Sequence, residues 1–196
     1  MLGIVLCGGN SSRMGSDKGL LNLEAKTWAQ TSFDKFAALQ IPVKLSINSD
    51  QLPVYTPAFS FADLVVDDPS LSVRGPLLGV LSCHLKYPAE DLFILACDMP
   101  LMEVSLLREL NALYQQQSSA SALVFTNDDE PEPLCGIYRA SGLSFIVEQL
   151  KSGRLAKHSM KSMLDQLEIM SIALPDDQKK SFRNFNSHAE LNGLQP

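Results

Sequence analysis

Short apolar runs alternate along the chain with segments in which apolar residues recur at helical spacing. The apolar run at residues 3–7 stops at two glycines and the run at 92–97 stops at an aspartate, as buried parallel strands do. Further strands are predicted at residues 42–47, 62–66, 122–125, 134–138 and 168–173. Helices are predicted at about 27–39, 77–85, 104–116, 143–150 and 162–167, with a last short helix that begins at a capping box at Ser187.

Repeated alternation of strand and helix predicts an α/β fold, a three-layer sandwich in which helices cover both faces of a mostly parallel central sheet. The polar stretches at residues 115–121 and 127–133 are predicted to be loops. The length of 196 residues suits one well-buried domain, so residues 1–196 are predicted to form a single domain. Ligands of such folds bind at the carboxyl ends of the strands, which is where the main polar clusters of this chain fall.

Composition and charge narrow the function. Hydrophobic residues make up 45% and charged residues 19%, and the net charge of −6 argues against a general nucleic-acid binder. No apolar run approaches the length of a transmembrane helix, and an apolar strand pattern follows Met1 at once, without a leader pattern. The four cysteines form no CxxC pair, which favours reduced, buried thiols. We therefore expect a cytoplasmic protein without a membrane segment.

The segment after the first strand, LCGGNSSRMGSDKGLL at residues 6–21, offers what a triphosphate needs. Gly8, Gly9 and Gly15 allow the backbone to approach a ligand closely, and successive N–H groups can form an anion site. Arg13 can bind two oxygens at once and Lys18 supplies a compact charge. The segment is neither a Walker A loop nor a GxGxxG fingerprint. The alternative is a solvated surface loop with an incidental Gly-Gly pair. The combination of Gly-Gly, Arg13, Gly15 and Lys18 directly after a strand disfavours it.

This segment resembles the LAGGxSxRMGxDKxLL signature of the MobA-like nucleotidyltransferases, and its DKGLL form is most similar to the molybdenum cofactor guanylyltransferases. The resemblance implies that the central sheet is Rossmann-like, of the nucleotide-diphospho-sugar transferase type. It also implies nucleotide contacts by Leu6, Cys7, Gly8, Gly9 and Lys18. Cys7 stands where alanine is usual, a change that should be tolerated because the family uses this stretch mainly through its backbone.

Asp98 follows the buried run at 92–97, so its carboxylate is expected at the end of a central strand, well placed for Mg²⁺. The alternative is an acidic residue that simply precedes a helix. The sequence ACDMPLM resembles the family's CDxP segment, which implies that Asp98 binds both Mg²⁺ and nucleotide.

For two further nucleotide contacts, the sequence offers two candidate residues each. Asp68 lies seven residues before GPLLG at 75–79, which resembles the family's D…GPLxG region, but Asp67 is an immediate alternative. Both aspartates could also serve an ordinary turn before a proline. Asn48 follows the second predicted strand and can offer a donor and an acceptor to a base or ribose. Ser46 is an equally simple match to the family's asparagine.

The segment FRNFNSHAEL at residues 182–191 resembles the FxNxNTPxEL ending of the guanylyltransferases, which implies pterin contacts by Asn184 and Asn186. Side chains two apart in extended backbone face the same side. Arg154 is predicted to meet the terminal phosphate of the pterin, with a solvated basic turn as the alternative.

The resemblance implies transfer of GMP from GTP to the terminal phosphate of molybdopterin, with Mg²⁺ as cofactor and pyrophosphate as second product. Arg13, Lys18 and Asp98 are the predicted catalytic residues. The N-terminal half is expected to bind nucleotide and the C-terminal half pterin. A relative that uses CTP or a sugar phosphate, or a catalytically silent nucleotide-binding regulator, is the alternative. The resemblance also implies molybdenum-insertion proteins and molybdoenzyme chaperones as partners, and a monomer or weak self-association is expected.

Overall fold

The structure is a computed structural model that describes residues 1–8, 17–23, 25–116 and 119–185. Seven strands form one sheet in the order β5-β4-β1-β6-β8-β7-β9, and within it only β8 runs antiparallel to its neighbours. The strands are β1 (Leu2–Leu6), β4 (Val43–Ile47), β5 (Leu64–Val66), β6 (Leu92–Ala96), β7 (Ala122–Asn127), β8 (Glu130–Tyr138) and β9 (Ile169–Ala173). A small ribbon pairs β2 (Asn22–Leu23) with β3 (Lys26–Thr27).

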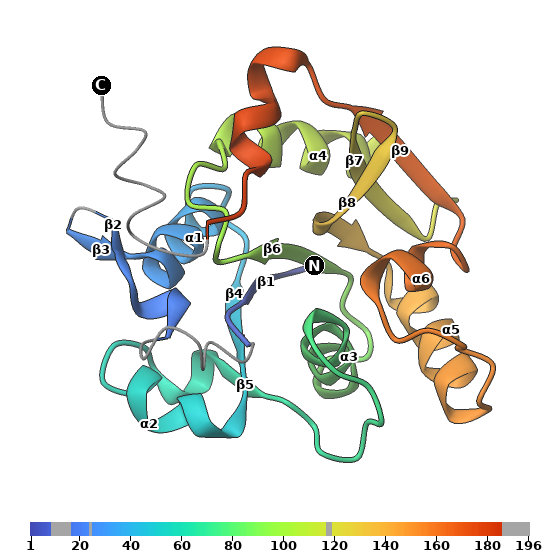
Figure 1. The fold of residues 1–196 in the computed structure, drawn as a ribbon, viewed down its shortest axis with the longest axis horizontal. Coiled ribbons are helices and arrows are strands. Elements are labelled where there is room, and N and C mark those ends of the chain that lie inside the picture. The colour runs from blue at the N-terminus through green and yellow to red at the C-terminus, as the bar shows by residue number, and fades with distance from the viewer. Residues whose placement is uncertain (9–16, 24, 117–118, 186–196) are drawn as a thin grey trace.

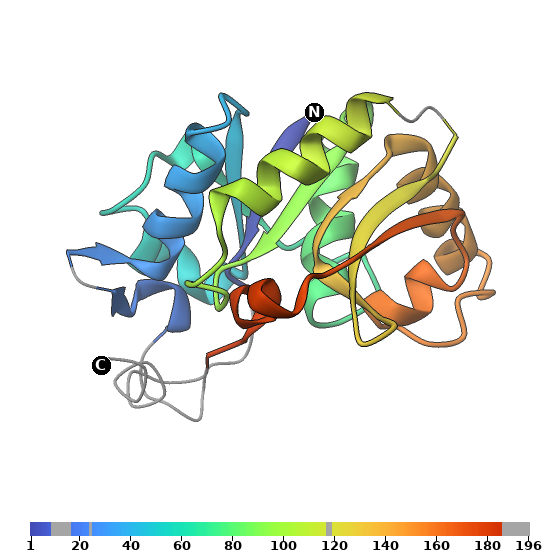
Figure 2. The same ribbon diagram turned by 90° about the horizontal axis from the view of Figure 1, so that it is seen from above.

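Helices cover both faces of the sheet (Figures 1 and 2). The helix residues buried against one face come from α1 (Trp28–Ala37) and α4 (Val104–Gln116). Those against the other come from α3 (Pro76–Lys86), α5 (Ala140–Lys151) and α6 (Met160–Leu164). The short helix α2 (Leu52–Tyr55) and the 3₁₀ turns η1 (Lys18–Leu20), η2 (Ser49–Gln51), η3 (Phe61–Asp63) and η4 (Asp176–Phe182) lie in the connections. The predicted three-layer α/β fold is confirmed.

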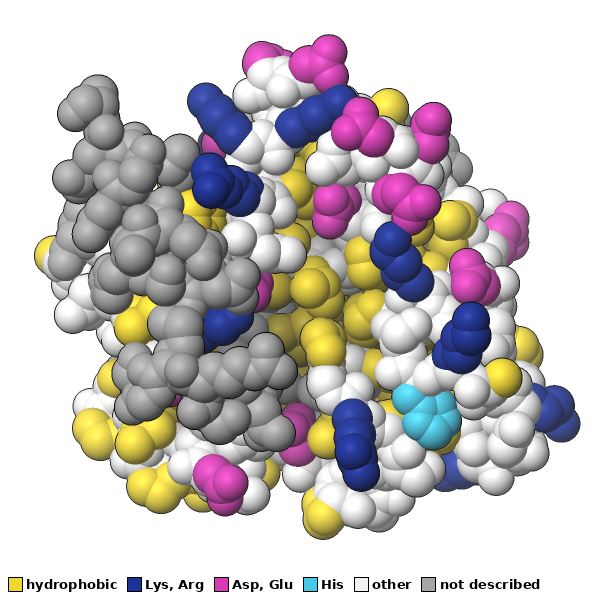
Figure 3. Space-filling view, viewed as in Figure 1, with side chains coloured by type: hydrophobic (Ala, Val, Ile, Leu, Met, Phe, Trp, Pro, Cys, Tyr) yellow, Lys and Arg dark blue, Asp and Glu magenta, His cyan; other side chains and the backbone are white. Residues whose placement is uncertain are grey.

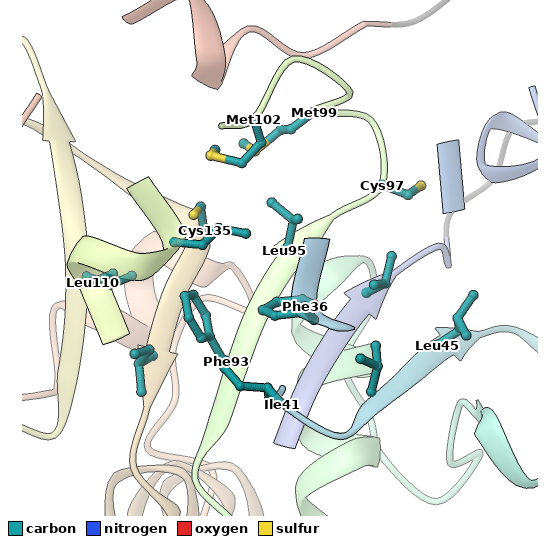
Figure 4. Close-up of a cluster of buried hydrophobic side chains, with 14 of the residues drawn as sticks. Phe36, Ile41, Leu45, Phe93, Leu95, Cys97, Met99, Met102, Leu110 and Cys135 are labelled. Atoms are coloured by element: carbon teal, nitrogen blue, oxygen red, sulfur yellow. The ribbon is translucent and has the colours of Figure 1, made fainter. Parts of the chain in front are cut away.

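The central strands are apolar on both faces because helices cover both. All five residues of β6 are buried, with their side chains pointing alternately into the two helical layers. In the layer under α1, the rings of Phe36 and Phe93 meet edge to face with centroids 5.1 Å apart (Figure 4). This packing fixes β6, and with it the position of the residues that follow its carboxyl end.

The predicted loop at residues 127–133 is wrong, because β7 and β8 form a tight hairpin there. Asp128 and Asp129 turn the chain with φ values of 49° and 63°, a conformation that aspartate tolerates. Pro131 and Pro133 made the segment look irregular. Strand β6 pairs with β8 only from Cys135 onward, so the prolines occupy the stretch that β6 does not pair.

The four cysteines are buried free thiols, as expected. In the part of the chain that the structure describes, no helix is both long and apolar enough to cross a membrane.

Candidate active site

The carboxyl ends of β1, β4 and β5 enclose a cavity of about 380 Å³ with the N-terminal end of α3. We call it the nucleotide cavity. Its lining residues are Leu6, Gly8, Ser46, Asn48, Asp67, Arg74, Gly75, Pro76, Leu78 and Gly79. Gly79 is required by the close approach of α3 to β4, since a Cβ there would lie 2.4 Å from Ser46 Oγ. Six residues of the two predicted motifs therefore line this cavity: Leu6, Gly8, Gly75, Pro76, Leu78 and Gly79.

The two neighbouring aspartates after β5 point to different places. Asp67 lines the nucleotide cavity, and its Oδ1 is buried with no hydrogen-bond partner among the described residues. Burial raises the pKa of Asp67 to about 6. Asp68 does not line this cavity, and its Oδ1 accepts a 2.8 Å hydrogen bond from the Ser70 backbone N–H. Hydrogen bonds from the side chain and the backbone of Ser70 lower the pKa of Asp68. The geometry thus favours Asp67, the alternative, over Asp68 for a nucleotide contact.

Both candidates at the end of β4 line the cavity. Ser46 is 1% exposed and sits beneath α3. Asn48 forms a reciprocal capping pair with Gln51, in which Asn48 Oδ1 accepts from the Gln51 N–H at 3.0 Å. The geometry keeps both residues as candidates and gives Asn48 a second, local function.

Lys18 and Asp98 come together at the end of β6, although 80 positions separate them in the sequence. Lys18 Nζ lies 3.9 Å from Asp98 Oδ2, and about a quarter of each side chain is exposed. The loop that carries Asp98 is anchored from below by Lys35 of α1, which donates a 2.8 Å hydrogen bond to the Pro100 carbonyl. Burial lowers the pKa of Lys35 to about 8. A cation and a carboxylate thus face solvent side by side.

The carboxylate of Asp98 is an unsatisfied group that fits a hard cation. Its Oδ1 is buried without a hydrogen-bond partner in the described structure. Burial raises the pKa of Asp98 above its ordinary value, and the Lys18 ammonium partly offsets that rise. No cluster of three His, Cys, Asp or Glu side chains that could hold a metal occurs among the described residues. A bound Mg²⁺ would therefore take most of its ligands from phosphates and water, its usual preference.

The C-terminal segment around Phe185 lies against the loop that carries Asp98. The Phe185 N–H donates a 2.9 Å hydrogen bond to the Asp98 carbonyl, and the Phe185 ring packs against the buried Trp28. Asn184 is exposed directly before this anchor. The structure therefore places one predicted pterin residue beside the predicted metal residue.

A second cavity, of about 410 Å³, shares the Arg74–Pro76 wall with the nucleotide cavity and lies against β8 and the start of α6. We call it the basic cavity. It is lined by Arg74, Gly75, Pro76, Leu77, Pro133, Leu134, His158, Ser159, Met160 and Lys161. The face in Figure 3 shows a hollow with hydrophobic side chains at its base and with Lys, Arg, His and acidic side chains around it. Sequence reasoning missed this cavity because its basic groups come from two segments far apart in the chain, Arg74 in one and His158 with Lys161 in the other.

Arg154 lines neither cavity. Its side chain is exposed and its Nε donates a 2.8 Å hydrogen bond to Gln149 Oε1. The contact of Arg154 with the pterin phosphate stays a prediction, and the place of Arg154 outside both cavities does not support it. Cys7 is buried and its carbonyl accepts from Gln51. The remaining site predictions, Gly9, Arg13 and Asn186, lie outside the described residues.

The fold and this strand-end arrangement of a cavity, a lysine and two half-buried carboxylates fit an α/β nucleotidyltransferase. The chain belongs to the family of the MobA-like NTP transferase domain, whose model matches residues 3–170.

Two of its relatives carry the same activity in their names. The chain is 30% identical over 190 residues to the "Probable molybdenum cofactor guanylyltransferase" of Flavobacterium johnsoniae, covering 97% of this chain and 94% of that protein. It is 30% identical over 188 residues to the "Molybdenum cofactor guanylyltransferase" of Campylobacter jejuni, covering 95% and 91%. A solved structure, molybdopterin-guanine dinucleotide biosynthesis protein A of Archaeoglobus fulgidus, shares the fold with a TM-score of 0.76 and 20% identity, covering 98% of this chain and 96% of that one.

Proposed function

We propose that this protein transfers GMP from GTP to the terminal phosphate of molybdopterin or its molybdenum-loaded form. The products are the guanine dinucleotide cofactor and pyrophosphate. The observation that carries this proposal is the approach of Lys18 to Asp98 at the strand edge beside the nucleotide cavity. The relatives named molybdenum cofactor guanylyltransferase support the choice of GTP and pterin.

The chemistry needs positioning and charge stabilisation rather than a general base. The acceptor is a phosphate monoester whose second pKa is about 6, so it is largely dianionic at neutral pH. One of its oxygens bonds to the α-phosphorus of GTP while the bond from that phosphorus to the bridging oxygen breaks, and pyrophosphate leaves with the electron pair. Lys18 stabilises the charge that builds on the α-phosphoryl oxygens. Arg13 holds the departing phosphates.

Asp98 would hold Mg²⁺, since one oxygen of its carboxylate is buried with no hydrogen-bond partner among the described residues. When bound, the ion neutralises phosphate charge and fixes the geometry of the triphosphate. Asp67 and the end of β4 bind the ribose or the base, because they line the cavity next to Gly8.

The acceptor lies on the other side of Asp98, toward the C-terminal half. Asn184 and Asn186 bind the heterocycle, and Arg74 and His158 of the basic cavity attract its phosphate. The protein acts in the cytoplasm with small-molecule substrates, as a monomer or weak self-associate. It delivers product to molybdenum-insertion proteins or molybdoenzyme chaperones.

Release of pyrophosphate tests the proposal. Purified protein, Mg²⁺ and molybdopterin are mixed in turn with GTP, ATP, CTP or UTP, and pyrophosphate is measured. We expect release with GTP that depends on both the acceptor and Mg²⁺. Release with CTP, or with a sugar phosphate in place of the pterin, would favour the related transferases. Nucleotide binding without any release would identify a regulator.

A further inference from the structure

One buried side chain contacts both described ends of the glycine-rich segment. Gln51, at the end of η2, is 5% exposed. Its Nε2 donates a 2.8 Å hydrogen bond to the Cys7 carbonyl, which immediately precedes Gly8. The same Nε2 donates a very short hydrogen bond to Asp17 Oδ2, immediately before Lys18. Both hydrogens of the Gln51 amide are therefore committed to this segment.

The oxygen of the same amide is bonded to a residue that lines the nucleotide cavity. Gln51 Oε1 accepts a 2.8 Å hydrogen bond from the Asn48 N–H, and Asn48 lines that cavity. A side-chain amide whose donors and acceptor are all used has one orientation, because turning it over would set donors against donors. Gln51 thus links the cavity lining, the start of the segment and its end.

Asp17, which Gln51 holds in place, in turn fixes the turn that carries Lys18. Its Oδ1 accepts from the Gly19 N–H at 2.9 Å and from the Tyr55 hydroxyl at 2.8 Å. Tyr55 is fully buried, and a Cβ on Gly19 would lie 2.1 Å from its hydroxyl, so the η1 turn packs directly on this group. Burial raises the pKa of Tyr55 well above its usual range, so the hydroxyl stays a donor. The side chain that leaves this turn is Lys18, which reaches Asp98.

We propose that Gln51, with Asp17 and Tyr55 as its partners, is a positioning residue that couples the cavity lining to the placement of Lys18 beside Asp98. This proposal rests on the proposed nucleotidyl transfer and adds a residue to it. Gln51 touches neither the cavity nor Lys18 directly. It acts by fixing Cys7 and Asp17, the residues that flank the phosphate-binding segment.

Preorganisation of this kind acts on affinity and rate together. A lysine whose own turn is already fixed loses less conformational entropy when a triphosphate binds beside it. A lysine held within about 1 Å of its working position keeps its effect on the transition state. Loss of the Gln51 donors therefore weakens nucleotide binding and lowers turnover, whereas a side chain with only a packing role would change the melting temperature alone.

The test uses two substitutions of nearly equal size. Gln51→Met removes both donors, and Gln51→Glu puts an acceptor against the Cys7 carbonyl and Asp17. For each we expect kcat/KM to fall by about 10- to 100-fold, with a weaker Kd for Mg²⁺-GTP measured by calorimetry. Gln30→Met and Gln30→Glu are matched controls, because Gln30 donates to Asp34 on the surface of α1, and both should retain turnover.

A pH profile separates positioning from packing. When protonated, the glutamate of Gln51→Glu again offers one donor, and a neighbouring carboxylate raises its pKa. Its kcat/KM relative to wild type should therefore recover several-fold as the pH falls from 8 toward 5. Gln51→Met has nothing to protonate and should show no recovery.

Hydrogen exchange provides a readout that needs no ligand. The Gly19 amide, bonded to Asp17, should exchange at least about tenfold faster in Gln51→Met than in wild type. Unchanged exchange, Kd and kcat/KM in folded Gln51→Met would overturn the proposal. Wild-type protein that releases no pyrophosphate would defeat the proposed function but not the positioning role, which the exchange rates and the Kd of whichever nucleotide binds would still decide.

Discussion

Acidic residues at the ends of β5 and β6 have surroundings opposite to those near β8 and β9. Asp67 and Asp98 are partly or mostly buried, each has an oxygen without a partner in the described structure, and burial raises both pKa values. Glu130 and Asp176 are exposed, each pairs with a lysine at 2.6 or 2.8 Å, and those lysines lower both pKa values.

This contrast shows which carboxylates have no cation or hydrogen-bond donor fully paired with them in the described structure. A buried carboxylate without a partner costs free energy, so such groups concentrate where a ligand supplies the missing partner. Exposed pairs contribute little to stability and need no ligand. The parallel half of the sheet is therefore expected to bind the cation and the nucleotide. The half around β8 is expected to tolerate changes of charge, except where it borders the basic cavity.

The largest expected effect is at Asp98. Asp98→Asn keeps the shape and removes the charge that binds Mg²⁺, so kcat/KM should fall by about 10³-fold or more. Added Mg²⁺ should recover only part of the loss. Asp176→Asn is the matched control on the exposed side and should retain full turnover. Equal Mg²⁺ dependence of Asp98→Asn and wild type would place the metal elsewhere.

Lys18 comes next. Lys18→Met keeps a long apolar stem and removes one preorganised cation, so transfer should fall by about 10²–10³-fold in steady-state assays. Lys44→Met removes a comparably exposed lysine that pairs with Asp63 at 2.8 Å, away from the nucleotide cavity. It should change the melting temperature slightly and leave kcat unchanged. Wild-type turnover by Lys18→Met would remove this lysine from the mechanism.

The sequence predicts the parallel half of the molecule better than the other half. Strands β1, β4, β5 and β6 lie where the apolar runs predict them, because helices on both faces demand continuous apolar residues. The β7–β8 hairpin was missed because a stretch of strand unpaired on one side accepts prolines. Sequence patterns also put Lys18 and Asp98 in one site, by resemblance to a family.

The rest of the site depends on contacts that no local pattern records. Gln51 and Tyr55 reach Asp17 across 34 and 38 positions, and neither belongs to a motif. Asp67 and Asp68 are the same residue type in the same turn. Only the direction of each side chain, set by the Ser70 N–H and by α3, distinguishes them.

That pair gives the third prediction. Asp67→Asn should raise the KM for GTP by about tenfold, whereas Asp68→Asn should change it by no more than about twofold, as measured by initial rates. Equal effects of the two substitutions would contradict the assignment of Asp67 to the nucleotide cavity.

The pH dependence of stability sharpens the third test. The pKa of Asp67 is about 6 in the folded chain and near 3.8 when unfolded, so the folded state holds one more proton between these values. Stability from this group therefore falls as pH rises from about 4 to about 6. Asp67→Asn lacks this loss, so its melting temperature relative to wild type should be higher at pH 8 than at pH 4. A difference that does not vary with pH would show that Asp67 is not buried as a carboxylate.

The smallest expected effect tests whether the C-terminal half has a binding role of its own. Asn184 is exposed beside the Phe185 N–H to Asp98 carbonyl bond, so Asn184→Ala should leave the fold intact. Loss of one neutral hydrogen bond to the acceptor should raise the KM for molybdopterin by about 2- to 12-fold. Replacing Asn186 as well should enlarge that effect, and the Kd for GTP should stay within about twofold of wild type.

Arg183→Ala, one residue earlier and also exposed, is the control for a general disturbance of this segment, and it should not reproduce the acceptor-selective change. If Asn184→Ala weakened GTP and acceptor equally, the C-terminal segment would support Asp98 rather than the pterin, and nucleotide and acceptor would not divide between the two halves.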